Sequence, residues 1–152
     1  MDNIDIEILR ILSGDADITD TALSKRISLS VPAVNKRVAK LKESGVIRKK
    51  AVLTNPKLVG KPITAYTMVV LEHFSGSEKL FEIVNADPDI LECYAITGEY
   101  DYMLKICAKD IDSLEQKILG LKNLGIAKSN TMFALMEHKF SPSPVPDRLQ
   151  EK

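Results

Sequence analysis

The chain has 152 residues, of which 45% are hydrophobic and 28% are charged, and its formal net charge is zero. A chain of this length holds one ordinary domain or two small ones, and a small domain buries so little core that association with a partner is expected. No apolar run approaches the roughly 20 residues that cross a bilayer, and the acidic start lacks the features of a secretory signal, so we expect a cytoplasmic protein with no membrane partner.

The first thirty residues carry the signals of two helices. Apolar side chains recur at helical spacing from Ile4 to Leu12, and the sequence Ser13-Gly14-Asp15 ends that helix. Thr19 is a good N-cap for a short second helix over Thr21 to Ile27. The pair Ser28-Leu29 then forms a turn.

A third helix begins after Ser30, with Pro32 in its first turn, where a missing N–H costs nothing. Val34, Val38 and Leu41 recur at i, i+4 and i+7 and are expected to face the core, and Ser44-Gly45 ends the helix. Two helices joined by a short turn, the second of them capped, form a helix-turn-helix whose last helix enters the major groove of DNA.

The charges are unevenly distributed along the chain. Residues 25–50 contain nine Lys and Arg against one Glu, whereas residues 55–152 contain eleven basic and fourteen acidic residues. A basic helix alone is more often a solvated face than a DNA surface. The cap, the turn, the helical spacing and the basic, β-prone segment from Val46 to Leu53, which we expect to form the strands of a small wing, together favour double-stranded DNA as the partner.

The exposed side of the third helix supplies the candidate DNA contacts. Asn35 suits adenine, and Lys36 or Arg37 suits guanine. Val31 or Ala33 suits a thymine methyl group, while the start and end of this side are better placed for phosphates. The predicted set is Ser30, Val31, Pro32, Ala33, Asn35, Lys36, Arg37 and Lys40, joined by Arg48, Lys49 and Lys50 of the wing, which would reach the DNA backbone.

The chain beyond the helices is predicted to be an α+β domain. Its order is strand, helix, strand, strand, helix, strand, which is the ferredoxin-like βαββαβ arrangement, with both helices on one face of an antiparallel sheet. The predicted elements are Ile63 to Glu72, Glu78 to Asn85, Ile90 to Thr97, Tyr102 to Ala108, Ile111 to Leu124 and Ala127 to His138. We therefore divide the chain into a helix-turn-helix domain (1–53), a linker (54–62), this second domain (63–140) and an extended tail (141–152).

The predicted hairpin between the two middle strands indicates a dimer. A turn centred on Tyr100 pairs Tyr94 with Ile106 and Ile96 with Leu104 toward the helices, although a bulge at Gly98 would shift this register. The opposite face is too apolar to be left in water and is most simply covered by a second copy of the sheet, so we expect a homodimer. That face would carry Cys93, Ala95, Thr97, Met103, Lys105 and Cys107.

The sequence offers no sign of catalysis or metal binding. In the predicted register Cys93 lies opposite Cys107, so a disulfide is geometrically possible, but two small buried hydrophobic residues fit a reducing cytoplasm better. These two cysteines and the two histidines, His73 and His138, lack metal-ligand spacing, and no catalytic constellation is visible. We expect no metal, no cofactor and no catalytic residue, and an accessory subunit whose helical domain binds protein instead of DNA is the main alternative.

Several ordered motifs together resemble the leucine-responsive/asparagine-regulator (Lrp/AsnC) family. Residues 1–9 resemble the family's L-D-x-x-D-x-x-I-L, residues 23–30 its E-L-A-x-x-V-G-L-S, residues 37–47 its R-I-x-x-L-E-x-x-G-V-I, and residues 94–102 its V-T-G-x-x-D-Y hairpin. Three departures stand out: Ser28 replaces a common Gly, Asp15-Ala16-Asp17 replaces D-G-R, and Lys49-Lys50 replaces G-Y.

The resemblance implies a transcription regulator that forms dimers, often assembled into octamers, with an amino-acid effector held near the hairpin. Carried over by position, the effector candidates are Thr97, Gly98, Glu99, Tyr100, Asp101 and Tyr102. Loop N–H groups suit a carboxylate and Asp101 suits an ammonium group. The alternative is turn chemistry, in which Gly98 permits the turn and Asp101 caps it.

Overall fold

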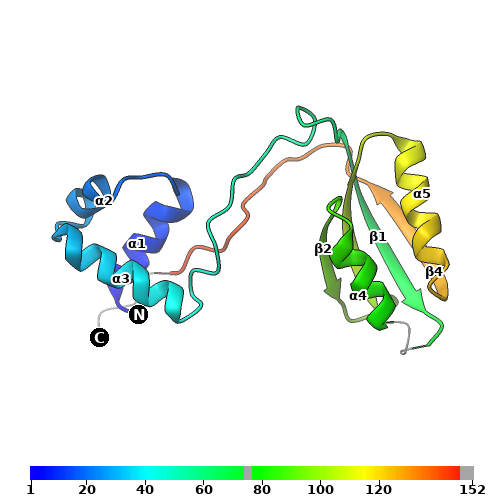
Figure 1. Ribbon diagram of the computed structural model, residues 1–152, viewed down its shortest axis with the longest axis horizontal. Helices are drawn as coiled ribbons and strands as arrows, with labels where there is room; N and C mark the ends of the chain where they lie inside the picture. The colour runs from blue at the N-terminus through cyan, green and yellow to red at the C-terminus, as the bar shows by residue number, and fades with distance from the viewer. Residues whose placement is uncertain (74–76, 148–152) are drawn as a thin grey trace. The chain divides into compact units, whose positions relative to one another are not determined.

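The computed structural model describes residues 1–73 and 77–147, which form two compact units (Figure 1). Of the described residues, 1–52 and 139–147 form the first unit, and 53–73 and 77–138 form the second. The predicted tail therefore groups with the first unit, where Arg10 donates a hydrogen bond of 3.2 Å to the carbonyl of Pro146. Residues 148–152 of that tail lie outside the described residues.

The first unit contains the three predicted helices, α1 (Asn3–Gly14), α2 (Asp20–Ile27) and α3 (Val31–Glu43). Their amphipathic spacing brings one side of each helix into a shared core, because burial of that side is what stabilises short helices. The core is made of Ile6, Ile8, Leu23, Val34 and Leu41.

The predicted strands of a wing over Val46 to Leu53 are wrong, because this segment contains no strand. After α3 the chain makes one turn, closed by a hydrogen bond of 2.9 Å from Ile47 N to the carbonyl of Leu41, and then continues toward the second unit. A strand needs a neighbouring strand to pair its N–H and C=O groups. The basic segment is not paired with one.

The second unit confirms the βαββαβ prediction. Its elements are β1 (Ile63–Leu71), α4 (Ser77–Ala86), β2 (Ile90–Ala95), β3 (Tyr102–Ala108), α5 (Ile111–Lys122) and β4 (Ile126–Phe133). The strands form an antiparallel sheet in the order β2-β3-β1-β4. The last strand ends five residues earlier than predicted, because Ala134 N bonds to the carbonyl of Thr64 and β1 offers only one further residue as a partner.

Both helices pack on one face of this sheet (Figure 1). Alternate residues of β1 and β3 point toward the helices and are almost fully buried, as the two-residue period of a strand requires. Leu80 of α4 and Leu114 and Leu121 of α5 pack on them. The strand residues of this core are Ala65, Val69, Leu71, Ile90, Tyr102, Leu104, Ile106 and Ala108.

The predicted hairpin register is wrong by three residues. Tyr94 pairs with Met103, not with Ile106, and Cys93 pairs with Leu104. The two strands are joined by a wider loop, closed by a hydrogen bond of 2.9 Å from Ile96 N to the carbonyl of Asp101. An odd shift exchanges the two faces of one strand, so β2 turns Cys93 toward the helices and Tyr94 away from them.

The face of the sheet that the helices leave uncovered is called the outer face below. It carries Tyr66 and Met68 of β1, Tyr94 of β2, Met103 of β3 and Met132 of β4. Tyr94 and Met132 are about half exposed, at 52% and 48%. The outer face therefore still gathers tyrosine and methionine side chains, beside the ion pair of Lys105 with Glu92 and the polar residues of β4, although its β2 residues differ from those predicted.

Candidate functional site

Local caps and turns position α3, the helix that the sequence predicts to contact DNA. The predicted N-cap Thr19 accepts a hydrogen bond from Ala22 N and starts α2, and Ser28 ends α2 in the left-handed conformation, with φ of +57°. Ser30 occupies the N-cap position of α3 with extended backbone, but its side chain makes no capping hydrogen bond. Ser28 thus forms the left-handed turn of the motif, in a conformation that favours Gly.

The structure divides the predicted DNA contacts on α3 into two groups. Ser30, Pro32, Asn35, Lys36 and Lys40 are exposed, whereas Val31, Ala33 and Arg37 are half-buried. Because Val34 and Leu41 are buried on the opposite side of the helix, the exposed group forms one continuous polar side. This side can meet a DNA groove without unpacking the core.

Arg37 is engaged within the protein. Its Nη1 lies 2.8 Å from a carboxylate oxygen of Asp2 and 2.7 Å from one of Asp5, at the start of α1. The sequence-based prediction assigned Arg37 to DNA and did not foresee this pairing.

Two of the three basic residues after α3 are freely presented, and the third is tethered. Arg48, Lys49 and Lys50 are all exposed. Lys50 donates a hydrogen bond of 3.0 Å to the carbonyl of Ala16 in the turn between α1 and α2. The cations of this segment therefore lie on an extended chain that is fixed to the helical core through Lys50.

The candidate effector loop joins β2 to β3. Thr97, Gly98 and Glu99 are exposed, and Gly98 has a φ of +117°, a conformation that side-chain-bearing residues rarely adopt. Glu99 forms an ion pair with Lys128 of β4, which raises the pKa of the lysine, and the Lys128 Nζ lies 4.7 Å from the centre of the Tyr100 ring. The sequence prediction missed Lys128, because nothing in the local pattern links it to a loop far away in the chain.

Asp101 and Tyr102 are tied into the sheet. A carboxylate oxygen of Asp101 accepts a hydrogen bond of 2.9 Å from Leu71 N, at the point where the pairing of β1 with β4 shifts register. The backbone N–H of Asp101 donates to the carbonyl of Val69. Tyr102 is buried, and its ring packs edge-on against Phe81. These two residues therefore hold the loop in place, and the side chain of Asp101 does so by bonding to β1 and not by capping the turn itself.

A hollow of about 420 Å³ lies beside this loop. Its lining mixes apolar and polar groups, as small-molecule sites do. The lining residues are Leu71, Ala95, Ile96, Asp101 and Tyr102, of which only the last two were predicted.

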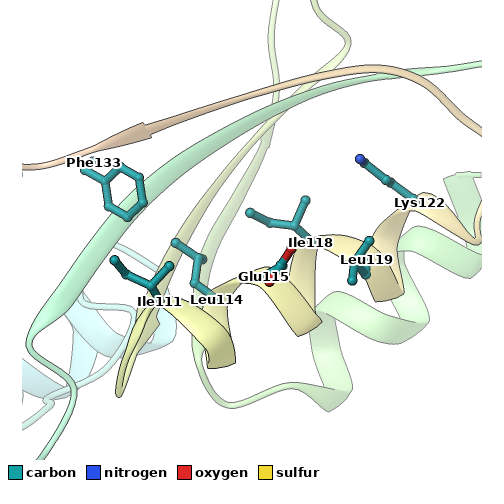
Figure 2. A pocket seen from close by; sticks show the side chains of 7 residues that line it. All are labelled: Ile111, Leu114, Glu115, Ile118, Leu119, Lys122 and Phe133. Atoms are coloured by element: carbon teal, nitrogen blue, oxygen red, sulfur yellow. The ribbon is translucent and has the colours of Figure 1, made fainter.

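A second hollow, of about 320 Å³, runs along α5 (Figure 2). In Figure 2, Phe133 of β4 lies beside Ile111 at one end, and Lys122 stands at the other. Ile111 is 64% exposed, so an apolar groove with Glu115 and Lys122 along it faces solvent.

Among residues 1–73 and 77–147, no group of three or more His, Cys, Asp or Glu side chains is arranged to hold a metal ion. No helix in those ranges is long and apolar enough to cross a membrane.

Both units match known protein families. Residues 64–144 match the family model of the Lrp/AsnC ligand binding domain, and residues 1–48 match a model of winged helix-turn-helix DNA-binding domains. The transcriptional regulator AzlB of Bacillus subtilis is 35% identical over 143 residues, which cover 91% of each chain. The leucine-responsive regulatory protein of Rhizobium meliloti is 36% identical over 121 residues, or 78% of each chain.

Solved structures agree with these matches. The crystal structure of a transcriptional regulator from Neisseria meningitidis in complex with L-Met superimposes with a TM-score of 0.89 at 29% identity, covering 95% of this chain and 96% of that one.

Proposed function

Because the chain belongs to the Lrp/AsnC family of transcriptional regulators, we propose that it reads specific DNA sequences through α3 and that an amino acid, bound in its second unit, changes how copies of the chain pack together. It is a regulator with a DNA-binding helix-turn-helix and an Lrp/AsnC ligand-binding domain, and not an enzyme. Its place of action is the cytoplasm, where the DNA of bacteria and archaea lies.

The exposed polar side of α3 carries the DNA-binding proposal. Asn35, Lys36 and Lys40 share this side, while the aliphatic side of the helix is buried. Asn and Lys are suited to base edges and phosphates. The cations Arg48 and Lys49 extend the positive charge along the chain beyond the helix.

The test is DNA affinity measured at several salt concentrations. Lys36→Ala is compared with Lys79→Ala, which removes the same charge from an exposed position on α4. If Lys36 contacts a phosphate, its loss weakens binding and lowers the slope of log affinity against log salt by about 0.9. Unchanged affinity and slope for Lys36→Ala would refute the assigned surface.

The hollow beside the β2–β3 loop is the proposed effector site. The regulator from Neisseria meningitidis was crystallised with an amino acid, and its fold matches over nearly the whole chain. In our proposal the ligand lies in the hollow beside Ala95 and Ile96. Thr97 and Gly98, which do not line the hollow, reach the ligand with their backbone N–H groups from the adjoining loop, and Asp101 holds that loop in place. Calorimetry against the twenty amino acids tests the site; heat from none of them would refute it.

The outer face is proposed to bind the outer face of a second copy, forming a two-fold dimer. Its tyrosine and methionine side chains are too apolar to remain in water, and a self-complementary face closes the assembly at two copies. Light scattering should give at least twice the 16.9 kDa of one chain. A monomer at micromolar concentration would refute this arrangement.

The groove along α5 is proposed to join such dimers into larger assemblies, up to an octamer. If two α5 helices pair antiparallel about a two-fold axis between Ile118 and Leu119, Glu115 of each meets Lys122 of the other. Glu115→Lys should therefore leave dimers, and the double change Glu115→Lys with Lys122→Glu should restore the larger species. Identical masses for all variants would refute this role of the groove.

A further inference from the structure

The two acids at the start of α1 serve two purposes at once. Asp2 is the N-cap of α1 and accepts a hydrogen bond from Asp5 N, while the Asp5 side chain accepts one from Asp2 N. This reciprocal arrangement satisfies backbone N–H groups that a helix start leaves unpaired. Both carboxylates also accept hydrogen bonds from Nη1 of Arg37 on α3.

This cluster is held more firmly than an ordinary surface ion pair. The side chain of Asp5 is only 14% exposed and that of Arg37 31%, whereas Asp2 is 53% exposed. The hydrogen bonds that Arg37 donates to Asp5 and then to Asp2 raise the pKa of its guanidinium above the ordinary value. Withdrawing the guanidinium would leave Asp5 partly buried without its cation, which is costly.

The position of Arg37 on α3 explains what the cluster controls. Arg37 is three residues from buried Val34 and four from buried Leu41, so it borders the packed side of the helix, while Lys36 and Lys40 lie on the exposed side. Adjacent residues of a helix differ in direction by about 100°. A rotation of α3 about its axis would therefore turn Lys36 and Lys40 away from the direction in which they now point.

We infer that Arg37 is a positioning residue: clamped by Asp2 and Asp5, it fixes the rotation of α3 on α1 and does not itself contact DNA. The inference rests on the proposed DNA binding through α3, and it replaces the sequence-based assignment of Arg37 to guanine or phosphate. Under this inference Asp2 and Asp5 increase DNA affinity by holding Arg37, although their negative charge alone would repel DNA.

The double change Asp2→Asn with Asp5→Asn gives opposite results under the two roles of Arg37. Asparagine keeps the side-chain oxygens that cap α1 but removes the charges that hold the guanidinium. The matched control is Asp17→Asn with Asp20→Asn, which removes two charges from exposed residues of the same unit. DNA affinity is measured over a salt series, with circular dichroism to check that each variant remains helical.

If Arg37 positions α3, the Asp2/Asp5 variant binds DNA about fivefold or more weakly than the control variant, within the range of coupling in one ion-pair network. Arg37→Gln then weakens binding similarly, leaves the salt slope unchanged, and adds little further loss when combined with the Asp2/Asp5 changes.

If Arg37 contacts DNA, the Asp2/Asp5 variant releases the guanidinium and binds more tightly than the control, and Arg37→Gln lowers the salt slope by about 0.9. Either result would overturn the inference, as would unchanged binding in all variants. Failure of the unaltered protein to bind any genomic fragment would instead overturn the proposed function, and this inference with it.

Discussion

Replacing Asp101 by alanine is expected to lower the free energy of unfolding of the second unit by about 1–2 kcal/mol. The carboxylate accepts the N–H of Leu71 at 2.9 Å, where the register shift between β1 and β4 interrupts the strand pairing. Hydrogen bonds to charged groups contribute about 1.5–3 kcal/mol. We take values around and below the lower end of this range because Asp101 is exposed and water partly replaces the lost bond.

Tyrosine fluorescence during urea unfolding measures this effect on the second unit alone, because the chain has no Trp and all four Tyr lie between residues 66 and 102. Asp101→Asn keeps an acceptor oxygen and should cost less than half as much as alanine. It should also keep amino-acid binding within a few-fold of the unaltered protein. Full stability of the alanine variant would refute the hydrogen-bond argument. Normal stability of the asparagine variant with complete loss of binding would show that the charge of Asp101 serves the ligand.

Two further changes test the conformation and the electrostatics of the fold. Ser28→Gly should stabilise the first unit by about 0.5–1 kcal/mol. The left-handed conformation of Ser28 costs a residue with a Cβ about 1–2 kcal/mol, and the greater freedom of glycine in the unfolded chain offsets about 0.4–1 kcal/mol of that gain. A lower melting temperature of the glycine variant would contradict this. Hydrogen bonds from Lys61 and then Lys117, which outweigh the effect of burial, hold the pKa of Asp89 below its ordinary 3.8. The stability that Asp89 supplies is therefore full above about pH 4 and is lost as pH falls through the lowered pKa. In chemical unfolding, the difference in stability between Asp89→Asn and the unaltered protein should disappear at low pH. A difference in stability that does not change with pH would contradict this.

The helices of the first unit follow from local signals in the sequence. The N-cap Thr19, Pro32 in the first turn of α3 and the spacing of buried residues are all signals between residues one or two helical turns apart. The sequence pattern alone therefore places these helices. The partners of Arg37 could not be found in this way, because Asp2 is 35 residues away. Helical spacing states which side of α3 a residue occupies, but not which charge from another helix will meet it there.

The segment from Val46 to Leu53 was predicted to form strands from its β-prone composition alone, and it forms none. β-prone residues are necessary for a strand, but a strand forms only where another strand pairs with it, and that partner is a property of the whole fold. The four strands of the second unit were predictable because their order with the two helices fits one compact topology, in which each strand has another strand to pair with.

The hairpin shows which inferences survive an error in register. The predicted pairing of Cys93 with Cys107 depended on one pair of residues, and it is wrong: Cys93 packs against the core and burial raises the pKa of its thiol, whereas Cys107 lies opposite Thr64. The preferred interpretation of the two cysteines does not depend on that pair, because both are free, Cys107 is buried and Cys93 is partly buried. The conclusion about the dimer depended on the character of a whole face. Leu104 and Ile106 of β3 keep their predicted orientation toward the helices, and Tyr94 replaces the smaller apolar residues that were predicted for β2 on the outer face. The prediction of a partner that covers this face therefore does not depend on the register.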